Sequence, residues 1–398
     1  MKTILYIHHS SDASSGSAKA LLHLLTCAKI NHYTPLVILP EKGELEDVIT
    51  KMGISVFTME FSYAIFPKTR SFIECILFPI LLIRRYFKNC IATNKLVTFC
   101  REQAIDLIHT NVSIVDIGFR ATQKLGIPHV WHLREYGGLS RNYFYYYNTF
   151  KGFCKQLCTP NNYPICISKD IKRHFQQLNN PNAFVIYDGV LHADKKIPYH
   201  DKQKYLLFVG KIDPQKGIED LIDAYAIYFK KTQNDSLILK IVGYAEDQTY
   251  EKKILDKIEH LQINSHIEFL GKQSDVQAFM SEAYAVVIPS HNEGFGYTTA
   301  EAMFSGALVI GHNDGGTKEQ LDNGEIETGH SIGIRYSSVI ELSDILYQIT
   351  TNEHSSYKET IIRGQETAVK LYSVESHIEN IAQLYQNIFN NAYNNHTT

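Results

Sequence analysis

The chain has 398 residues, of which 44% are hydrophobic and 20% are charged. This length suits two domains of ordinary size, and the apolar content excludes a disordered protein. The net charge of -3 hides an asymmetry, because residues 1–200 hold 23 lysines and arginines against 14 acids, while residues 201–398 hold 16 against 28. The basic half favours an anionic partner, and the acidic half argues against a nucleic-acid-binding protein.

The first half alternates short apolar runs with amphipathic stretches, which indicates a parallel sheet covered by helices. The first run, Ile4–Ile7, follows Met1 too closely for a secretory signal, and the seven cysteines lack the spacing of a disulfide framework. Both features are typical of a cytoplasmic protein. Strands are predicted at residues 4–7, 35–39, 55–59, 107–109, 129–133, 165–167 and 184–187.

Two stretches interrupt this pattern. Residues 72–88 are apolar but contain Arg84, Arg85 and Lys88, and they are too short and too charged to span a bilayer. Residues 143–147 are mostly tyrosine and lie among basic residues. Each stretch either contacts a membrane interface or packs on its own domain, and the sequence leaves both interpretations open.

The second half repeats the alternation and ends in a helical pattern. Strands are predicted at residues 205–209, 237–242, 266–269, 285–289 and 308–310. Residues 374–392 carry apolar side chains at a helical rather than a strand period, so they are predicted to form a closing helix. The chain is therefore predicted to contain two doubly wound α/β domains in tandem.

The most informative stretch, residues 289–306, follows a predicted buried strand. In parallel sheets, ligands bind where strands end. Gly294 and Gly296 allow the backbone to approach a ligand, and the helix that follows offers free N–H groups to an anion. Glu293 and Glu301 are suited to accept hydrogen bonds from hydroxyl groups of a ribose or another sugar. The alternative is that Glu301 only solvates its helix.

Two lysines, Lys211 and Lys216, follow the first strand of the second half. Gly210 ends that strand, and Pro214 and Gly217 shape the turn that carries the lysines. A pair of ammonium groups can neutralise a diphosphate without a metal ion. The alternative interpretation is an ordinary pair of solvated lysines.

These motifs resemble those of the retaining GT-B glycosyltransferases of family 4, which use nucleotide-sugar donors. The resemblance rests on residues 209–217, 241–243, 268–271, 293–301 and 327–329. It implies two tandem Rossmann-like α/β domains that face a cleft. Residues 1–195 would bind the acceptor, residues 196–375 would bind the nucleotide sugar, and residues 376–398 would form a helix closing back toward the first domain.

The resemblance also implies residue roles. Lys211 and Lys216 would hold the donor diphosphate, and Glu301 would bind the ribose. Glu293 would bind the transferred sugar and His132, placed in the loop after a strand, would approach it, so that Glu293, His132 and Lys216 are the expected catalytic residues. The expected donor site comprises Lys211, Lys216, Gly243, Gly271, Glu293, Gly294, Phe295, Gly296, Tyr297, Glu301 and, in the loop after the first strand, Gly16.

The implied reaction moves a hexose, with retention, to a glycan acceptor, expected to be a lipid-linked intermediate of surface polysaccharide synthesis. No cofactor besides the nucleotide sugar is expected. No metal site is expected either, because Asp12, Asp213 and Asp314 are isolated in the sequence. Residues 72–88 would contact an anionic membrane, placing the protein peripherally on the inner face of the plasma membrane. The alternative is a non-catalytic accessory subunit that binds glycan or stabilises an active partner.

Overall fold

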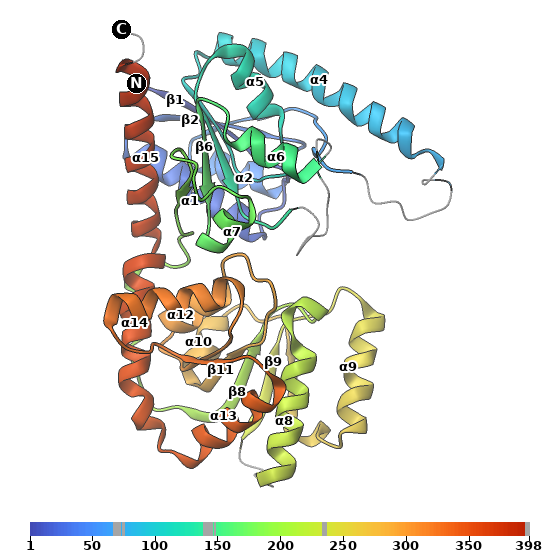
Figure 1. Ribbon diagram of the computed structural model, residues 1–398, viewed down its shortest axis with the longest axis vertical. Coiled ribbons are helices and arrows are strands. Elements are labelled where there is room, and N and C mark those ends of the chain that lie inside the picture. The colour runs from blue at the N-terminus through green and yellow to red at the C-terminus, as the bar shows by residue number, and fades with distance from the viewer. Residues whose placement is uncertain (67–72, 74–75, 138–145, 147–148, 233–236, 395–398) are drawn as a thin grey trace. The chain divides into compact units, whose positions relative to one another are not determined.

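The computed structural model divides the chain into two compact units (Figure 1). It describes residues 1–66, 73, 76–137, 146, 149–232 and 237–394, with side chains to residue 390. Unit 1 comprises Met1–Gly189 and His377–Thr398, and unit 2 comprises Val190–Ser376. The units therefore meet along the chain at 189/190 and 376/377, beside the boundaries of 195/196 and 375/376 expected from the sequence.

Unit 1 is built on a seven-stranded parallel sheet with the order β3-β2-β1-β4-β5-β6-β7. The strands are β1 (Thr3–Ile7), β2 (Thr34–Leu39), β3 (Ser55–Thr58), β4 (Leu107–Thr110), β5 (His129–Leu133), β6 (Asn162–Cys166) and β7 (Phe184–Val185). Side chains alternate between the two faces, so Ile4 and Tyr6 join one core and Leu5 and Ile7 join the other. Burial on both faces explains why the strands read as apolar runs.

Helices cover both faces of this sheet. One face packs against α1 (Gly16–Ile30), α2 (Glu44–Lys51) and α15 (Val374–Asn394), and the other packs against α4 (Phe78–Glu102) and α5 (Ile117–Leu125). Two further helices, α6 (Thr149–Leu157) and α7 (Lys169–His174), follow β5 and β6. The predicted C-terminal helix is thus present as α15, and its residues from His377 onward belong to unit 1.

Unit 2 is built on a six-stranded parallel sheet with the order β10-β9-β8-β11-β12-β13. The strands are β8 (Gln203–Val209), β9 (Ile238–Val242), β10 (Ile267–Gly271), β11 (Ala283–Ile288), β12 (Val309–His312) and β13 (Ile334–Tyr336). The short β13 was not predicted. The strand order reverses between β8 and β11, and ligands of doubly wound sheets bind at the carboxyl ends of the strands near such a reversal.

The helices of unit 2 complete a doubly wound fold. They are α8 (Ile218–Thr232), α9 (Gln248–His260), α10 (Val276–Glu282), α11 (Tyr297–Phe304), α12 (Gly315–Thr328), α13 (Val339–Thr351) and α14 (Lys358–Tyr372). Apolar residues of α8, α9 and α13 pack on one face of the sheet. The predicted α/β class with two Rossmann-like domains is therefore confirmed.

Helix α4 is only partly attached to unit 1. Its buried residues begin at Asn89, so its first eleven residues, 78–88, contribute none to the core. In Figure 1 this part of α4 extends away from the sheet. Among the described residues, we find no helix with the length and apolarity needed to cross a bilayer. Residues 72, 74 and 75 of the predicted interfacial stretch lie outside the described residues, as do residues 143–145 and 147 of the tyrosine-rich stretch.

Candidate functional site

Three glycines line up at the carboxyl ends of neighbouring strands in unit 2. Gly210 follows β8, Gly243 follows β9 and Gly271 ends β10, and each has a positive φ angle. The backbone N–H of Gly243 donates to the carbonyl of Gly271 at 2.9 Å. A Cβ atom on Gly243 would lie 1.8 Å from the Gly210 carbonyl oxygen, so only glycine fits there. This edge of the sheet exposes backbone where a ligand can approach closely.

The loop after β8 places Lys216. Residues 214–216 form a turn of 3-10 helix, and the Asp213 carboxylate accepts hydrogen bonds from two backbone N–H groups of that turn. Gly217 ends the turn at a φ of 66°, and a Cβ atom there would lie 2.0 Å from the carbonyl oxygen of Pro289. The loops that follow β8 and β11 are therefore packed directly on each other.

This packing brings two predicted catalytic residues together. The Lys216 ammonium lies 2.8 Å from a Glu293 carboxylate oxygen, and the side chains are 28% and 21% exposed. The other predicted lysine, Lys211, pairs instead with Glu246, and that hydrogen bond raises the pKa of Lys211. A lysine ammonium has three donors, so Lys216 can hold Glu293 and still bind an anion.

The loop that carries Glu293 is held in place by the start of α12. The N–H of Gly316 donates to the Glu293 carbonyl at 2.7 Å, and the Gln320 side chain donates to the carbonyls of Phe295 and Gly296 at 2.7 and 3.0 Å. Sequence analysis did not assign these roles to Gly316 and Gln320. The available signal was the double glycine at 315–316, where a side chain would meet the loop backbone.

Helix α11 begins directly after this loop. Gly296 precedes it with a φ of 90°, and no side chain caps the first turn. The free N–H groups at this helix end can therefore face an anion. Phe295 is buried, whereas Tyr297 and Glu301 are half-buried. Glu301 lies one helical turn after the start of α11, as the sequence predicted.

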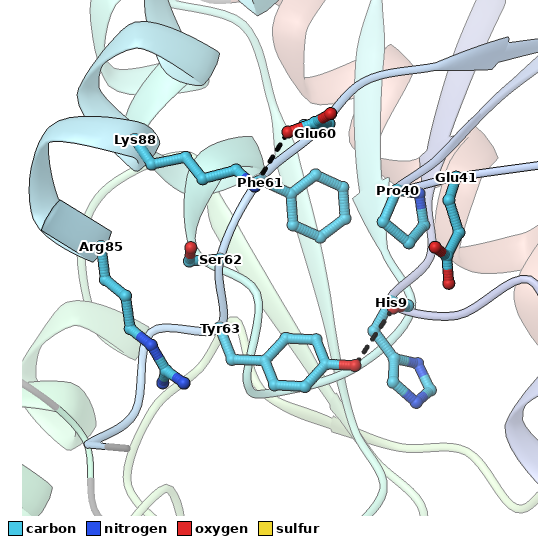
Figure 2. A pocket seen from close by; sticks show the side chains of 9 residues that line it. All are labelled: His9, Pro40, Glu41, Glu60, Phe61, Ser62, Tyr63, Arg85 and Lys88. Atoms are coloured by element: carbon cyan, nitrogen blue, oxygen red, sulfur yellow. Dashed lines mark hydrogen bonds and ion pairs between the residues drawn. The ribbon is translucent and has the colours of Figure 1, made fainter. Parts of the chain in front are cut away.

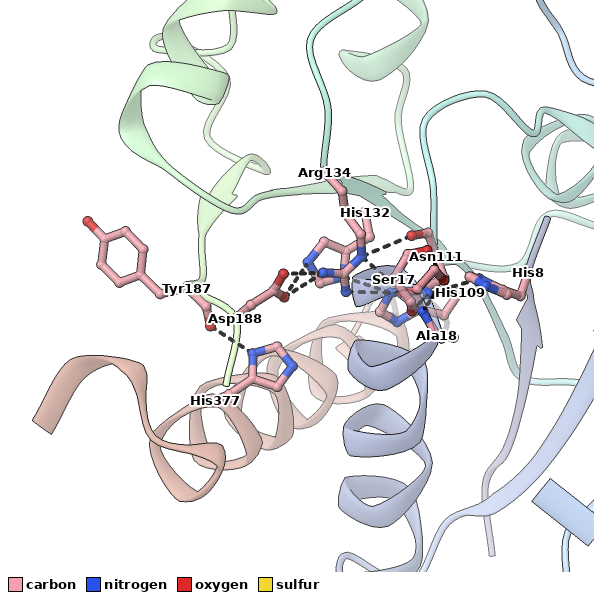
Figure 3. A network of polar contacts seen from close by, with 11 residues as sticks. His8, Ser17, Ala18, His109, Asn111, His132, Arg134, Tyr187, Asp188 and His377 are labelled. Carbon is pink, nitrogen blue, oxygen red and sulfur yellow. Dashed lines mark hydrogen bonds and ion pairs between the residues drawn. The ribbon is translucent and has the colours of Figure 1, made fainter. Parts of the chain in front are cut away.

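His132, in unit 1, lies inside β5 (Figure 3). The strand predicted at residues 129–133 is therefore present, but His132 is part of it and not of the loop that follows, and its side chain is fully buried. Its Nδ1 atom is 3.1 Å from the Arg134 guanidinium and 3.3 Å from Nε2 of His109. Because a guanidinium only donates, Nδ1 is the acceptor and the proton of the neutral ring sits on Nε2. Burial lowers the pKa of His132 well below its ordinary value, so the ring is neutral at pH 7.

Arg134 connects the strand ends around His132. Its guanidinium donates to both carboxylate oxygens of Asp188, and a second nitrogen donates to the Asn111 side chain at 3.0 Å. The Arg134 and Asp188 side chains are only 6% and 1% exposed. His377 of α15 donates to the Tyr187 carbonyl beside Asp188 (Figure 3). Sequence analysis missed this ion pair, because its members lie far apart along the chain.

Gly16 also differs from its predicted placement. It is the first residue of α1 rather than part of the preceding loop, and it is exposed. Ser15 caps the helix, because its hydroxyl accepts a hydrogen bond from the N–H of Ala18 at 3.2 Å. Across the described residues, no group of three or more histidine, cysteine, aspartate or glutamate side chains is arranged to hold a metal ion.

The amino-acid sequence is similar to those of known glycosyltransferases. Residues 192–367 match the family described as glycosyl transferases group 1. An uncharacterised glycosyltransferase of Methanocaldococcus jannaschii is 29% identical over 296 residues, which cover 72% of this chain and 76% of that protein. An O-antigen chain mannosyltransferase of Salmonella typhimurium is 31% identical over 175 residues, covering 44% of this chain and 46% of that protein.

Solved structures show the same fold. The crystal structure of Anabaena HepE in complex with UDP has a TM-score of 0.73 and 22% identity, covering 97% of this chain and 100% of that chain. A glycosyltransferase from Rickettsia africae has a TM-score of 0.75 and 17% identity, covering 98% of each chain. HepE has also been solved with UDP-glucose. These likenesses extend over both units.

Proposed function

We propose that this chain is a glycosyltransferase that transfers a hexose from a nucleotide-sugar donor to a glycan acceptor with retention of configuration, and its matches to glycosyltransferases support this proposal. The observation that carries this proposal is the Lys216–Glu293 ion pair, held beside a helix start at the reversal of strand order in unit 2. The complexes of HepE with UDP and UDP-glucose support a nucleotide-sugar donor.

The proposed chemistry follows from charge. Breaking the sugar–phosphate bond leaves negative charge on the diphosphate and positive charge on the sugar. Lys216 and the first N–H groups of α11 stabilise that diphosphate without a metal ion, and more strongly in the transition state than in the ground state. Glu293 accepts hydrogen bonds from the sugar, and Glu301 accepts them from the ribose. Lys211 and the glycines at 243 and 271 complete the proposed donor site in unit 2.

The proposed acceptor is a lipid-linked glycan at the cytoplasmic membrane face. The excess of basic residues in the first half and the name of the Salmonella relative support this class of acceptor. Helix α4 supports membrane contact, because its free part carries one apolar stripe with arginines beside it. The members of this stripe within residues 78–88, each more than half exposed, are Ile80, Ile83 and Phe87.

Substitutions in unit 2 test the donor site. Lys216→Ala and Glu293→Gln are expected to lower kcat about a hundredfold, because each removes a group that acts in the transition state. Glu301→Gln is expected to raise KM with a smaller effect on kcat. The measurement is nucleotide release from a panel of nucleotide sugars with glycolipid acceptors, with and without a chelator. Lys231→Ala, at an exposed ion pair with Asp344, is the matched control.

Three outcomes would contradict the proposal. Unchanged turnover in Lys216→Ala and Glu293→Gln would remove the assigned roles. A strict need for a divalent ion would overturn the metal-free mechanism. Donor binding without any turnover across the acceptor panel would instead indicate the accessory subunit.

A separate experiment tests membrane contact. Replacing Ile80, Ile83 and Phe87 with serine removes three exposed apolar side chains, and we expect loss of binding to vesicles of anionic phospholipid. Ile340→Ser, at a residue of unit 2 that is 60% exposed, is the control. Equal vesicle sedimentation of the triple variant and the control would remove the membrane proposal.

A further inference from the structure

A pocket of about 370 Å³ opens at the carboxyl edge of the unit 1 sheet (Figure 2). His9 reaches it from the segment after β1, Glu41 from the segment after β2 and Tyr63 from the segment after β3, while Arg85 and Lys88 reach it from α4. This edge is where parallel sheets bind ligands. None of the residues assigned to the donor site lines the pocket.

The wall that carries Tyr63 is rigid. The Asn89 side chain accepts a hydrogen bond from the N–H of Ser62 at 2.7 Å and donates to the carbonyl of Ser62 at 2.9 Å. Asn89 is fully buried and also donates to Asp116 at 3.1 Å. The N–H of Ala64 donates to the carbonyl of Ile114. These bonds form the pocket before any ligand arrives, which lowers the cost of binding.

The two cationic side chains of the pocket differ in their partners. Lys88 pairs with Glu60 at 3.0 Å. Arg85 donates to the carbonyl of Ile65 at 3.2 Å, and within the described part of the chain it has no carboxylate partner. Burial lowers the pKa of His9, so this ring adds no charge at pH 7. The Glu41 side chain belongs to an exposed residue, where water screens its charge.

A half-buried arginine without a carboxylate partner favours an anionic ligand. The planar guanidinium matches the geometry of a carboxylate or phosphate, which can accept two N–H bonds from it. Figure 2 shows the Tyr63 ring between the side chains of Arg85 and His9. Tyr63 is 38% exposed, and its hydroxyl donates to the His9 carbonyl at 3.3 Å. The ring thus offers a fixed apolar surface beside the cation.

We propose that this pocket binds the acceptor through an oxyanion of the acceptor that pairs with Arg85, while the adjoining sugar ring packs on Tyr63. This inference rests on the proposed function and narrows the acceptor to an acidic one. The oxyanion is either the carboxylate of an acidic sugar or a phosphate that links the sugar to its lipid. Both present the same chemistry to Arg85, and the experiment separates them.

The test measures binding to the full-length protein by isothermal titration calorimetry. One probe is a disaccharide ending in glucuronic acid, the second is glucose joined through a diphosphate to a short prenyl chain, and the third is the neutral disaccharide ending in glucose. We expect Arg85→Gln to weaken one of the two anionic probes about tenfold or more, as loss of a charge-assisted hydrogen bond requires. Arg85→Lys keeps the charge but loses the two-bond geometry, so we expect an intermediate loss.

Arg84→Gln is the matched control, because Arg84 is the exposed neighbour on α4 and does not line this pocket. We expect it to leave both anionic affinities unchanged. The anionic probe that depends on Arg85 identifies the source of the oxyanion. Four outcomes would overturn the proposal. The neutral disaccharide or inorganic phosphate could bind as tightly as the anionic probes. Arg84→Gln could lose as much affinity as Arg85→Gln, or neither anionic probe could bind.

Nucleotide binding distinguishes failure of this inference from failure of the proposed function. We expect Arg85→Gln to bind UDP or another nucleoside diphosphate as the unsubstituted protein does, because Arg85 lies in unit 1 and the proposed diphosphate ligand Lys216 lies in unit 2. If the protein binds the nucleotide but Arg85→Gln weakens neither anionic probe, only the proposal of an acidic acceptor is overturned. If Arg85→Gln weakens an anionic probe but the protein binds no nucleotide, the proposed glycosyltransferase function is overturned and the pocket remains an anion-binding site.

Discussion

The two units differ in the ion pair that each holds at the carboxyl edge of its sheet. In unit 2 the Lys216–Glu293 ion pair is partly exposed and sits among glycines, so its charges can reach a ligand. In unit 1 the Arg134–Asp188 ion pair is almost fully buried among histidines, so its charges satisfy each other and tie strand ends together. The contrast teaches that a charged cluster at the end of a parallel strand is a binding site only where its environment leaves it accessible.

The largest expected difference between the units is in their stability at acid pH, where unit 1 should lose more than unit 2. Burial lowers the pKa of His109, His132 and His377, so the folded unit binds fewer protons than the unfolded chain. Above the ordinary histidine pKa of about 6.5, these histidines leave the free energy of unfolding of unit 1 undiminished. As the pH falls below that value, each lowers this free energy by up to about 1.4 kcal/mol per pH unit. Trp131, the only tryptophan, is buried in unit 1, so its fluorescence during urea unfolding reports this loss.

Unit 2 is the internal reference for the acid experiment. Burial lowers the pKa of His312 and His354 there, so some acid sensitivity is expected from both units. Circular dichroism follows both units, and we expect the transition seen by Trp131 to move to lower urea first. A fluorescence midpoint that is equal at pH 7 and pH 5 would refute the interpretation of the buried histidines.

The next effect is loss of the buried ion pair. Asp188→Ala leaves the Arg134 guanidinium buried without its carboxylate, which is expected to cost about 3–5 kcal/mol in the free energy of unfolding of unit 1. Asp344→Ala removes the acid of an exposed pair with Lys231 and is expected to cost less than about 1 kcal/mol. Chemical unfolding of both variants gives the comparison, and similar costs would contradict the structural role of Asp188.

Substitution of glycine tests whether the loops that follow β8 and β11 in unit 2 pack directly on each other. Gly217→Ala combines a positive φ angle with a Cβ atom placed 2.0 Å from the Pro289 carbonyl oxygen, whereas Gly329→Ala has a positive φ angle and nothing within 4 Å. The backbone conformation alone is expected to cost about 1 kcal/mol, so Gly329→Ala gives the reference. Calorimetry should show a clearly larger loss for Gly217→Ala, together with weaker nucleotide binding, because the two loops must separate.

The smallest effect is expected at Lys211. Its side chain is 48% exposed and pairs with the 66% exposed Glu246, so Lys211→Ala should raise the donor KM by less than about fivefold. Lys216→Ala, measured in the same nucleotide-release assay, should lose far more. Equal losses would show that both lysines hold the diphosphate to the same degree.

Much of the fold was predictable because its strands are buried on both faces. Runs such as Ile4–Ile7 and residues 205–209 are continuous and apolar, and each proved to be part of a strand. The three-residue β13 has Arg335 between Ile334 and Tyr336, so it has no continuous apolar run. In the candidate donor site, the residues that follow β8 and β11 were predictable because glycines and charged residues stand directly after apolar runs.

The rest depended on contacts between distant residues. Arg134 and Asp188 lie 54 positions apart, and Lys216 and Glu293 lie 77 apart, so no local pattern joins them. His132 was expected in a loop because it stands close to Arg134 and Glu135 at the end of a predicted strand, yet it lies inside β5, where it hydrogen-bonds with His109 and Arg134. The closing helix was predicted, but the hydrogen bond between its Tyr385 and His109 of β4 was not.

That closing helix constrains the order in which the two units can fold during synthesis. The core of unit 1 includes Ile381, Leu384, Tyr385 and Ile388, which follow the whole of unit 2 along the chain. Domains emerging from the ribosome usually fold from the N-terminus onward. Here the unit whose first residues are synthesised earlier can complete its core only after every residue of the other unit has been made.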